Sequence, residues 1–259
     1  KPSFEALKRS GLLEGSDVQV FEAEPAPLTL VERVHAPEHM ERMRTEPSER
    51  MYYDVALLSA GSVLKASEMV AREEAENAFA YTGTAGHHAS RGSCWGFCYF
   101  NDVAISILRL REMGMERFLI VDVDPHFGDG TRNFFGGDPN VYHINFNHQQ
   151  SSNFDGELNN YDIGIGFDAD DEQFLRELGS AMEMAKDFDF EICFVVFGHN
   201  SHADDYGGFE LTIAAYPKMA RIIKEAVGDR GIVFVLSGGS VPEVASKAIP
   251  EVIAVLAGR

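Results

Sequence analysis

Five short apolar runs, rich in valine, isoleucine and phenylalanine, constrain the fold of this 259-residue chain more than any other feature. They span residues 78–81, 118–122, 141–146, 192–197 and 232–236. Strands that are apolar at nearly every position are buried on both faces, which is typical of parallel sheets covered by helices. The runs therefore predict an α/β fold, a three-layer single domain with a mainly parallel central sheet and helices on both faces.

Stretches with apolar residues at helical spacing fill the intervals between these runs. Helices are predicted at residues 53–75, 102–113, 171–188, 213–227 and 241–257. The first part of the chain is expected to form two surface-exposed helical segments, residues 4–13 and 28–43, broken by prolines. No linker-like segment divides the chain, so we expect one domain over residues 1–259.

A polar or glycine-rich cluster follows each predicted strand. The clusters read GTAGHHAS, DPHFGDGT, NHQQSS, GHNSHADD and SGGS. Ligands of parallel α/β sheets bind beyond the carboxyl ends of the strands. We therefore expect all five clusters to lie at one edge of the sheet and to form a functional site there.

The second cluster carries the densest set of metal-binding side chains. In an extended strand Asp122 and Asp124 point to the same side, while Val123 points to the other. Pro125 ends the strand and restricts Asp124 to extended conformations, which turns His126 inward. A carboxylate and an imidazole suit Zn²⁺ or another divalent transition metal. Asp124 and His126 are therefore candidate metal ligands, and two ligands do not complete a site.

His87 and His88 stand together in a glycine-flanked loop after the first predicted strand. Adjacent imidazoles can act as a general base and a general acid beside a metal, provided that a carboxylate holds each ring. Asp122 and Asp129 flank the candidate ligands and are natural partners. The alternative is two surface histidines without chemistry, but the neighbouring clusters favour the catalytic interpretation.

Two further clusters add candidates with weaker signals. Segment 198–205 follows an apolar strand and can supply a third ligand, or can merely form turns and helix caps. Gly238 and Gly239 would let the backbone approach a bound substrate closely. Alternatively, they form a turn into a helix that Ser240 caps.

An aromatic, glycine-containing loop separates the histidine pair from the next predicted helix. Gly96 and Phe97 in this loop can line an access channel for an extended apolar substrate stem. They can equally pack under the loop as part of the core, because aromatic side chains dominate such packing.

Composition limits the partners and the environment. With 41 acidic and 22 basic residues the formal net charge is −19, which argues against direct binding to a nucleic-acid backbone. The charge suits cationic substrates, or solubility alone. Three cysteines form no CxxC pair, and no apolar run reaches about 18 residues, so we expect a cytoplasmic protein without membrane insertion. A homo-oligomer is left open.

Four motifs occur together in the chain in the order HHASRGSCWGFCYFND, DVDPHFGDGT, GHNSHADDYGGF and LSGGS. In order and spacing they resemble the zinc-dependent histone deacetylase family, which also includes acetylpolyamine amidohydrolases and acetoin-utilisation proteins. The resemblance covers nearly the whole chain and implies the arginase-like fold of that family. The first helix is similar to the segment after the family's first strand, so we expect that strand to be missing here.

The resemblance implies roles for the candidates in the middle of the chain. Asp124 and His126 match the family's metal-binding Asp and His, while His87 and His88 match its histidine pair. The implied reaction is hydrolysis of an N-acyl amide, of the acetyl-lysine or acetylpolyamine type, with Zn²⁺ or another divalent transition metal as cofactor. A histidine takes the proton of the attacking water and then protonates the leaving amine.

The same resemblance assigns the supporting residues. Asp122 matches the acid that supports the first histidine, and it borders a site for a monovalent cation, which implies a structural K⁺ there. Asp129 matches the acid that supports the second histidine. Gly96 and Phe97 match the loop that forms one wall of the family's acyl-lysine tunnel.

Two positions depart from the family pattern. Asn200 stands where the family has its third metal ligand, an Asp; a neutral amide oxygen can coordinate, but metal affinity should fall with the lost negative charge. Ser240 stands where most family deacetylases have a tyrosine that donates to the developing oxyanion. Serine is too short to reach the same point, and Tyr99 or Tyr206 could substitute only if the loops bring one of them into the site.

Neighbouring side chains do not obviously restore the ligand set. His199 is expected to face away from Asn200, and His202 would need a rearranged loop. The sequence leaves open whether Asn200 is natural or a substitution that weakens catalysis. We expect a deacylase, weakened by Asn200 and Ser240, with a catalytically impaired acyl-amine-binding protein as the alternative. Arginase-like hydrolysis at two metals is disfavoured because further carboxylates are missing around residues 122–126.

Overall fold

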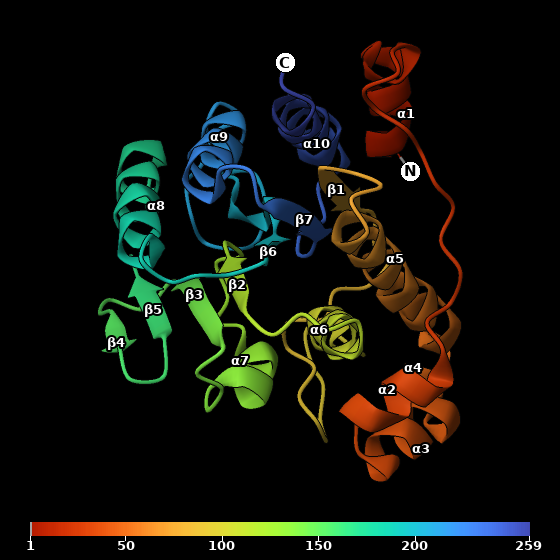
Figure 1. Ribbon diagram of the computed structural model, residues 1–259. Helices are drawn as coiled ribbons and strands as arrows, with labels where there is room; N and C mark the ends of the chain where they lie inside the picture. Colours follow the sequence, from red (N-terminus) through yellow and green to blue (C-terminus); the bar gives the residue numbers. More distant parts are fainter. Residues whose placement is uncertain (1) are drawn as a thin grey trace.

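The computed structural model describes residues 2–259 and contains a seven-stranded sheet in the order β1-β7-β6-β2-β3-β5-β4 (Figure 1). The strands are β1 (Asn77–Ala80), β2 (Phe118–Asp122), β3 (Val141–Asn147), β4 (Asn153–Asp155), β5 (Asn160–Gly164), β6 (Ile192–Phe197) and β7 (Gly231–Leu236). All neighbours pair in parallel except β4 and β5. The five predicted strands and the mainly parallel sheet are confirmed.

Ten α-helices and two 3₁₀ helices are present within the described residues. They are α1 (Pro2–Arg9), η1 (Leu12–Glu14), α2 (Leu28–Val34), α3 (Pro37–Thr45), α4 (Pro47–Arg50), α5 (Tyr53–Ala71), α6 (Asp102–Glu112), α7 (Asp129–Phe135), α8 (Asp171–Ala185), η2 (His199–Ser201), α9 (Ala215–Val227) and α10 (Pro242–Leu256). None of the helices in residues 2–259 is both long and apolar enough to cross a bilayer.

Helices cover both faces of the sheet, and successive residues of each central strand point to opposite layers (Figure 1). On one face α1, α8, α9 and α10 pack against strand residues that include Leu119 and Val121. On the other face α2, α3, α5 and α6 pack against a set that includes Phe118 and Ile120. The three-layer architecture expected for these apolar strands is confirmed.

The sequence pattern does not predict β4, β5 or α7. The strand β4 is the largely exposed edge strand, and β5 beside it mixes polar and apolar residues, so neither presents a continuous apolar run. The helix α7 starts at Asp129 inside the polar cluster, and Phe135 is its one buried large apolar residue. Short elements of this kind owe their structure to the neighbours that they pair with.

Several helix boundaries differ from the predicted ones, at a proline or at residues with a left-handed backbone conformation. The segment expected at residues 28–43 divides into two helices, because Pro37 occupies the first turn of α3. The segment expected at residues 53–75 ends early, and Glu73 adopts a left-handed conformation with φ of 58°. Gly11, with φ of 77°, separates α1 from η1.

An extended segment, residues 18–27, connects η1 to α2 and runs along α5 (Figure 1). The Ala26 amide donates to the Leu57 carbonyl oxygen at 2.9 Å. The crossing point is Gly61, where an added Cβ would overlap the Glu24 carbonyl oxygen. Glycine is therefore required at this position so that the two backbones can touch.

Replacing Gly61 with alanine should lower the free energy of unfolding by roughly 1–3 kcal/mol, because the segment must move away from α5. Gly179, which lies inside α8 with open space at its Cβ position, is the matched control. There Gly179→Ala should stabilise by about 0.5–1 kcal/mol through helix propensity. Urea unfolding of both variants measures the difference, and equal effects would contradict the crossing.

His35 is fully buried beneath the loop that follows the histidine pair. Its Nδ1 lies 2.9 Å from the Ser90 carbonyl oxygen, and its Nε2 lies 3.0 Å from the Asn101 amide, which donates to it. Burial, with the neighbouring His39, lowers the pKa of His35 to about 3. A second proton would meet the Asn101 amide, so the folded protein keeps this ring neutral.

Between pH 6.5 and pH 3 the unfolded chain binds a proton at His35 that the folded chain does not. Stability is therefore fully present above pH 6.5 and falls by about 1.4 kcal/mol per pH unit below it. His35→Gln should lose about 2 kcal/mol less than the parent protein between pH 6.5 and pH 5. Urea unfolding at several pH values tests this, and parallel pH profiles would rule the effect out.

Candidate active site

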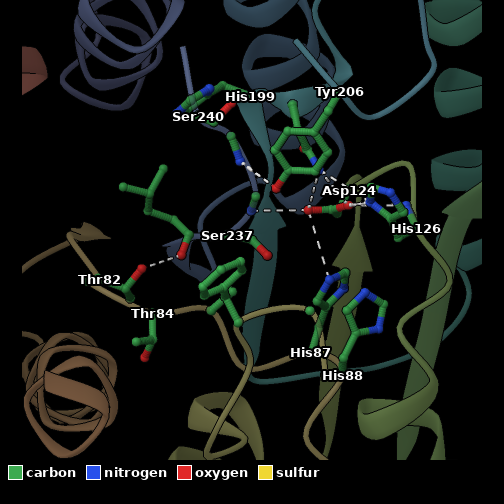
Figure 2. Close-up of a pocket in the computed structure, with 18 of the residues that line it drawn as sticks. Thr82, Thr84, His87, His88, Asp124, His126, His199, Tyr206, Ser237 and Ser240 are labelled. Atoms are coloured by element: carbon green, nitrogen blue, oxygen red, sulfur yellow. Dashed lines mark hydrogen bonds and ion pairs between the residues drawn. The ribbon is translucent and has the colours of Figure 1, made fainter. Parts of the chain in front are cut away.

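A cavity of about 620 Å³ opens at the carboxyl edge of the sheet, beyond β1, β2, β6 and β7 (Figure 2). Four of the five polar clusters supply its lining. The NHQQSS cluster supplies none, because β3 lies one strand further from the cavity. From this cluster the His148 ring approaches His126, with 5.7 Å between ring centroids. All five clusters therefore lie at the carboxyl edge of the sheet as predicted, but NHQQSS does not contribute to the cavity.

After β2 the chain turns at Pro125 and brings His126 inward toward Asp124, as predicted. Asp122 and Asp124 are buried, with 0% and 1% of their surfaces exposed. Asp122 Oδ1 accepts a hydrogen bond from the Asp124 amide at 3.1 Å. Asp124 Oδ1 accepts from the His126 amide at 3.1 Å and lies 2.9 Å from His126 Nδ1. Asp124 and His126 therefore meet at one point of the cavity wall.

Asn200 completes this group from η2. Its Nδ2 donates to the two carboxylate oxygens of Asp124 at 3.1 and 3.2 Å and lies 3.3 Å from His126 Nδ1. Its Oδ1 is buried and has no hydrogen-bond partner within residues 2–259. An acceptor left without a partner in a buried site calls for a cation or a donor.

These three residues fit a divalent metal ion as one carboxylate, one imidazole and one amide oxygen. Asp124, His126 and Asn200 would hold the ion once the Asn200 amide turns its Oδ1 toward Asp124. Within the described residues no three His, Cys, Asp or Glu side chains form a metal-binding group. The neutral third ligand is the reason, because the other two candidates are Asp and His.

Both histidines of the pair are buried, so the surface alternative is wrong. His87 Nδ1 lies 2.9 Å from Asp122 Oδ2, and His88 Nδ1 lies 2.7 Å from Asp129 Oδ1. The centroids of the two imidazole rings are 4.0 Å apart, and Trp95 stacks on His88 with 3.6 Å between ring centroids. With both Nδ1 atoms facing carboxylates, both Nε2 atoms are left for the cavity.

The two imidazoles have opposite electrostatic environments. Burial disfavours the charged form of His87, but Asp122 and Asp124 outweigh it and raise its pKa to about 9. Burial and the charge of His87 lower the pKa of His88 to about 4. Despite burial, His87 and His126 hold the pKa of Asp124 well below its usual value. The pair thus carries one positive charge at neutral pH, on His87.

Gly96 and Phe97 form part of the cavity wall rather than of the core. Both have left-handed backbones, with φ of 61° and 58°, and the Phe97 side chain is 68% exposed. The Phe97 ring meets the Tyr52 ring edge-on, with centroids 5.9 Å apart. Core packing is therefore wrong for Phe97.

Gly238 and Gly239 permit close approach, but to the protein itself. The Gly238 amide donates to Asp124 Oδ2 at 3.1 Å, and an added Cβ there would overlap Asn200. Gly239 has φ of 137°, and its added Cβ would overlap the His199 ring. Gly238 thus holds the Asp124 carboxylate in place, and both glycines line the cavity.

Ser240 does not cap α10. Its hydroxyl donates to Asp205 Oδ1 at 3.0 Å, and the amides of Ser240 and Val241 donate to Asp205 Oδ2 at 2.9 and 3.0 Å. Asp205, which the sequence pattern does not single out, therefore anchors the start of α10. The acidic pair after His202 was the signal available for it.

The remaining candidates separate clearly. His199 lines the cavity beside Asn200, because η2 replaces the alternation of an extended strand, and its Nδ1 lies 3.3 Å from Asp205 Oδ2. His202 does not line the cavity; its Nδ1 accepts from the Asp204 amide at 3.0 Å. Tyr99 is buried and stacks on Tyr52 with centroids 5.0 Å apart.

Tyr206 does enter the cavity wall (Figure 2). Its hydroxyl accepts a hydrogen bond from the Gly239 amide at 3.3 Å, and its ring centroid lies 5.9 Å from that of His126. Trp95 is a further lining residue that the sequence pattern misses, and its Nε1 donates to Asp129 Oδ2 at 3.0 Å.

The fold and the site define an α/β domain with a carboxylate–imidazole group and a carboxylate-linked histidine pair in one cavity. The chain belongs to the histone deacetylase domain family, whose sequence model matches residues 2–256.

The relatives support the same placement. The chain is 28% identical over 263 residues to the "Probable deacetylase" of Archaeoglobus fulgidus, covering 92% of this chain and 73% of that protein. It is 29% identical over 206 residues to human histone deacetylase 9, covering 71% of this chain and 20% of that protein. A crystal structure of the HDA15 HD domain has a TM-score of 0.87, covering 99% of this chain and 81% of that one. Its 22% identity makes this a likeness of fold.

Asn200→Asp should raise the affinity for Zn²⁺ by on the order of tenfold or more, because it adds a negative charge to the ligand group. Without metal the variant should be less stable, since a carboxylate would replace the amide that donates to Asp124. Isothermal titration with Zn²⁺ and metal-free urea unfolding measure the two effects. Asn140→Asp, which adds the same charge at an exposed position, is the control. Equal affinities in both variants would contradict Asn200 as a ligand.

Proposed function

We propose that this protein hydrolyses N-acyl amides of the acetyl-lysine or acetylpolyamine type with Zn²⁺ or another divalent transition metal. The observation that carries the proposal is the convergence of Asp124, His126 and Asn200 with the His87–His88 pair in one cavity. Bound there, the ion would polarise the amide carbonyl and make a water more acidic. The named deacetylases among the relatives support hydrolysis over simple binding of an acyl amine.

The histidine pair supplies the proton transfers. His88 is the neutral member at pH 7 and takes the proton of the attacking water, while Asp129 holds its Nδ1 side. His87 is the charged member, held by Asp122, and lies with its Nε2 at 3.9 Å from Asp124 Oδ2. As the water oxygen bonds to the carbonyl carbon and the C–N bond breaks, the leaving nitrogen receives the proton that His88 took from the water. The products are a carboxylate and an amine.

The wall of the cavity suits an extended stem that ends in an acyl group. Trp95, Phe97 and Tyr206 line it and are each more than half exposed. Such aromatic surfaces pack against the methylene chain of a lysine or a polyamine. The net charge of −19 favours a cationic substrate or product amine.

A structural K⁺ beside Asp122 belongs to the same proposal. Both oxygens of Asp122 accept hydrogen bonds within a fully buried environment. Burial raises the pKa of this carboxyl group even though His87 opposes the effect. A buried carboxylate with incomplete compensation suits a monovalent cation nearby.

The test is hydrolysis of acetyl-lysine peptide, trifluoroacetyl-lysine peptide and acetylpolyamine by protein that has been stripped with a chelator and reloaded with Zn²⁺. We expect turnover of at least one substrate, lost on stripping and restored on reloading. His88→Ala should lower kcat/KM by roughly 10²–10⁴-fold. His202→Asn, outside the cavity, should retain activity because its side-chain oxygen can still accept the Asp204 amide. Absence of turnover on all three substrates with metal bound would refute the proposal.

A further inference from the structure

The hydroxyl of Tyr206 occupies a defined place beside the metal-binding group. Figure 2 shows Tyr206 on one side of Asp124 and the two histidines on the other. The Gly239 amide donates to Tyr206 Oη at 3.3 Å, and the amide of the preceding residue, Gly238, donates to Asp124 Oδ2 at 3.1 Å. Two consecutive amides thus hold the phenol and the carboxylate next to each other.

The geometry leaves the proton of this phenol unused. A phenol oxygen that accepts one hydrogen bond still has its own O–H to donate. Among residues 2–259 no protein acceptor for the Tyr206 O–H is present within hydrogen-bond distance, and the side chain is 59% exposed. The donor is therefore free for a bound molecule.

Three other hydroxyls of the same wall, those of Thr82, Ser237 and Ser240, are covered or already donate to protein groups. The Ser240 hydroxyl donates to Asp205 and is directed at that carboxylate rather than at Asp124. The Ser237 hydroxyl oxygen is buried and has no hydrogen-bond partner within residues 2–259, so it is covered from the cavity in this structure. Thr82 Oγ1 donates to the Leu236 carbonyl oxygen at 2.5 Å, on the side of the cavity away from His126 (Figure 2).

The backbone around Tyr206 is held by buried groups even though the ring is exposed. Asp205, whose side chain is 0% exposed, accepts hydrogen bonds from the Tyr206 amide at 2.9 Å and from the amides at the start of α10. On the other side the Gly207 amide donates to the Asn200 carbonyl oxygen at 2.9 Å. These bonds tie the position of Tyr206 to that of Asn200, which is the organisation that transition-state stabilisation needs.

We propose that Tyr206 is a catalytic residue whose hydroxyl donates a hydrogen bond to the carbonyl oxygen of the bound acyl group, and to the negative charge that develops there. The assignment rests on the proposed hydrolysis of N-acyl amides. It supplies from the β6–α9 connection the donor that Ser240 does not provide.

Tyr206→Phe removes this one hydroxyl, and Tyr99→Phe is the matched control on a buried tyrosine outside the cavity. On acetyl-lysine peptide, Tyr206→Phe should lower kcat by roughly 10²–10³-fold with little change in KM. The loss should be smaller on trifluoroacetyl-lysine peptide, because the fluorines already stabilise the developing anion. Tyr99→Phe should behave as the parent protein on both substrates.

A binding measurement tests the contact between Tyr206 and the acyl oxygen independently of turnover. The probe is a peptide in which a methyl ketone replaces the acetyl amide of acetyl-lysine, labelled with ¹³C at the carbonyl. Tyr206→Phe should weaken its binding by roughly tenfold in isothermal titration, and the bound ¹³C resonance should move toward its free position. The parent protein could bind the ketone in this Tyr206-dependent way and yet hydrolyse no substrate. That result would refute the proposed hydrolysis and support the contact between Tyr206 and the acyl oxygen.

The opposite result is equally distinct. Unchanged turnover, ketone affinity and ¹³C shift in Tyr206→Phe would overturn the assignment and leave hydrolysis intact. Failure of the parent protein to bind the ketone at all would overturn it as well.

Discussion

The buried carboxylate of Asp124 is the interaction on which the site depends. An unpaired carboxylate in the interior costs several kcal/mol, so donors must surround it. They come from three separate parts of the chain, namely His126, Asn200 and the Gly238 amide. Each donor stands at the end of a different strand, β2, β6 or β7, so the carboxylate fixes three loops relative to one another. The His87 charge, shared with Asp122, compensates what remains.

The sheet makes this arrangement possible because its central strands are buried on both faces. β2 lies between β6 and β3 in the sheet. Its last residue is Asp122, and the residues after it supply Asp124, His126 and Asp129, while Asn200 comes from η2 after β6. On the opposite wall, the Asp205 carboxylate likewise holds separate segments together. By joining η2 to the start of α10, it fixes Tyr206 and Ser240 in their different orientations.

Much of this could be predicted from the chain alone. The five apolar runs, the layers and the placing of Asp124 near His126 follow from local rules, because a fully apolar strand and a proline at its end leave few alternatives. The edge strand β4 and its neighbour β5 could not be predicted, because β4 is largely exposed and polar residues interrupt the apolar pattern of β5. His199 faces the cavity contrary to expectation, because a 3₁₀ turn replaced the assumed strand geometry.

The sequence by itself determined the sheet, its polar edge and the family to which the chain belongs, because periodicity and ordered motifs are local properties. The sequence also predicted the His87–Asp122 and His88–Asp129 pairs, but tertiary structure decided the partners of the other polar side chains in the site. The Ser240 hydroxyl donates to Asp205, and the Asn200 amide donates to Asp124. The Tyr206 hydroxyl has no protein acceptor within residues 2–259. Which acceptor each donor reaches depends on the distances between loops that are far apart in the chain. No local sequence pattern encodes those distances.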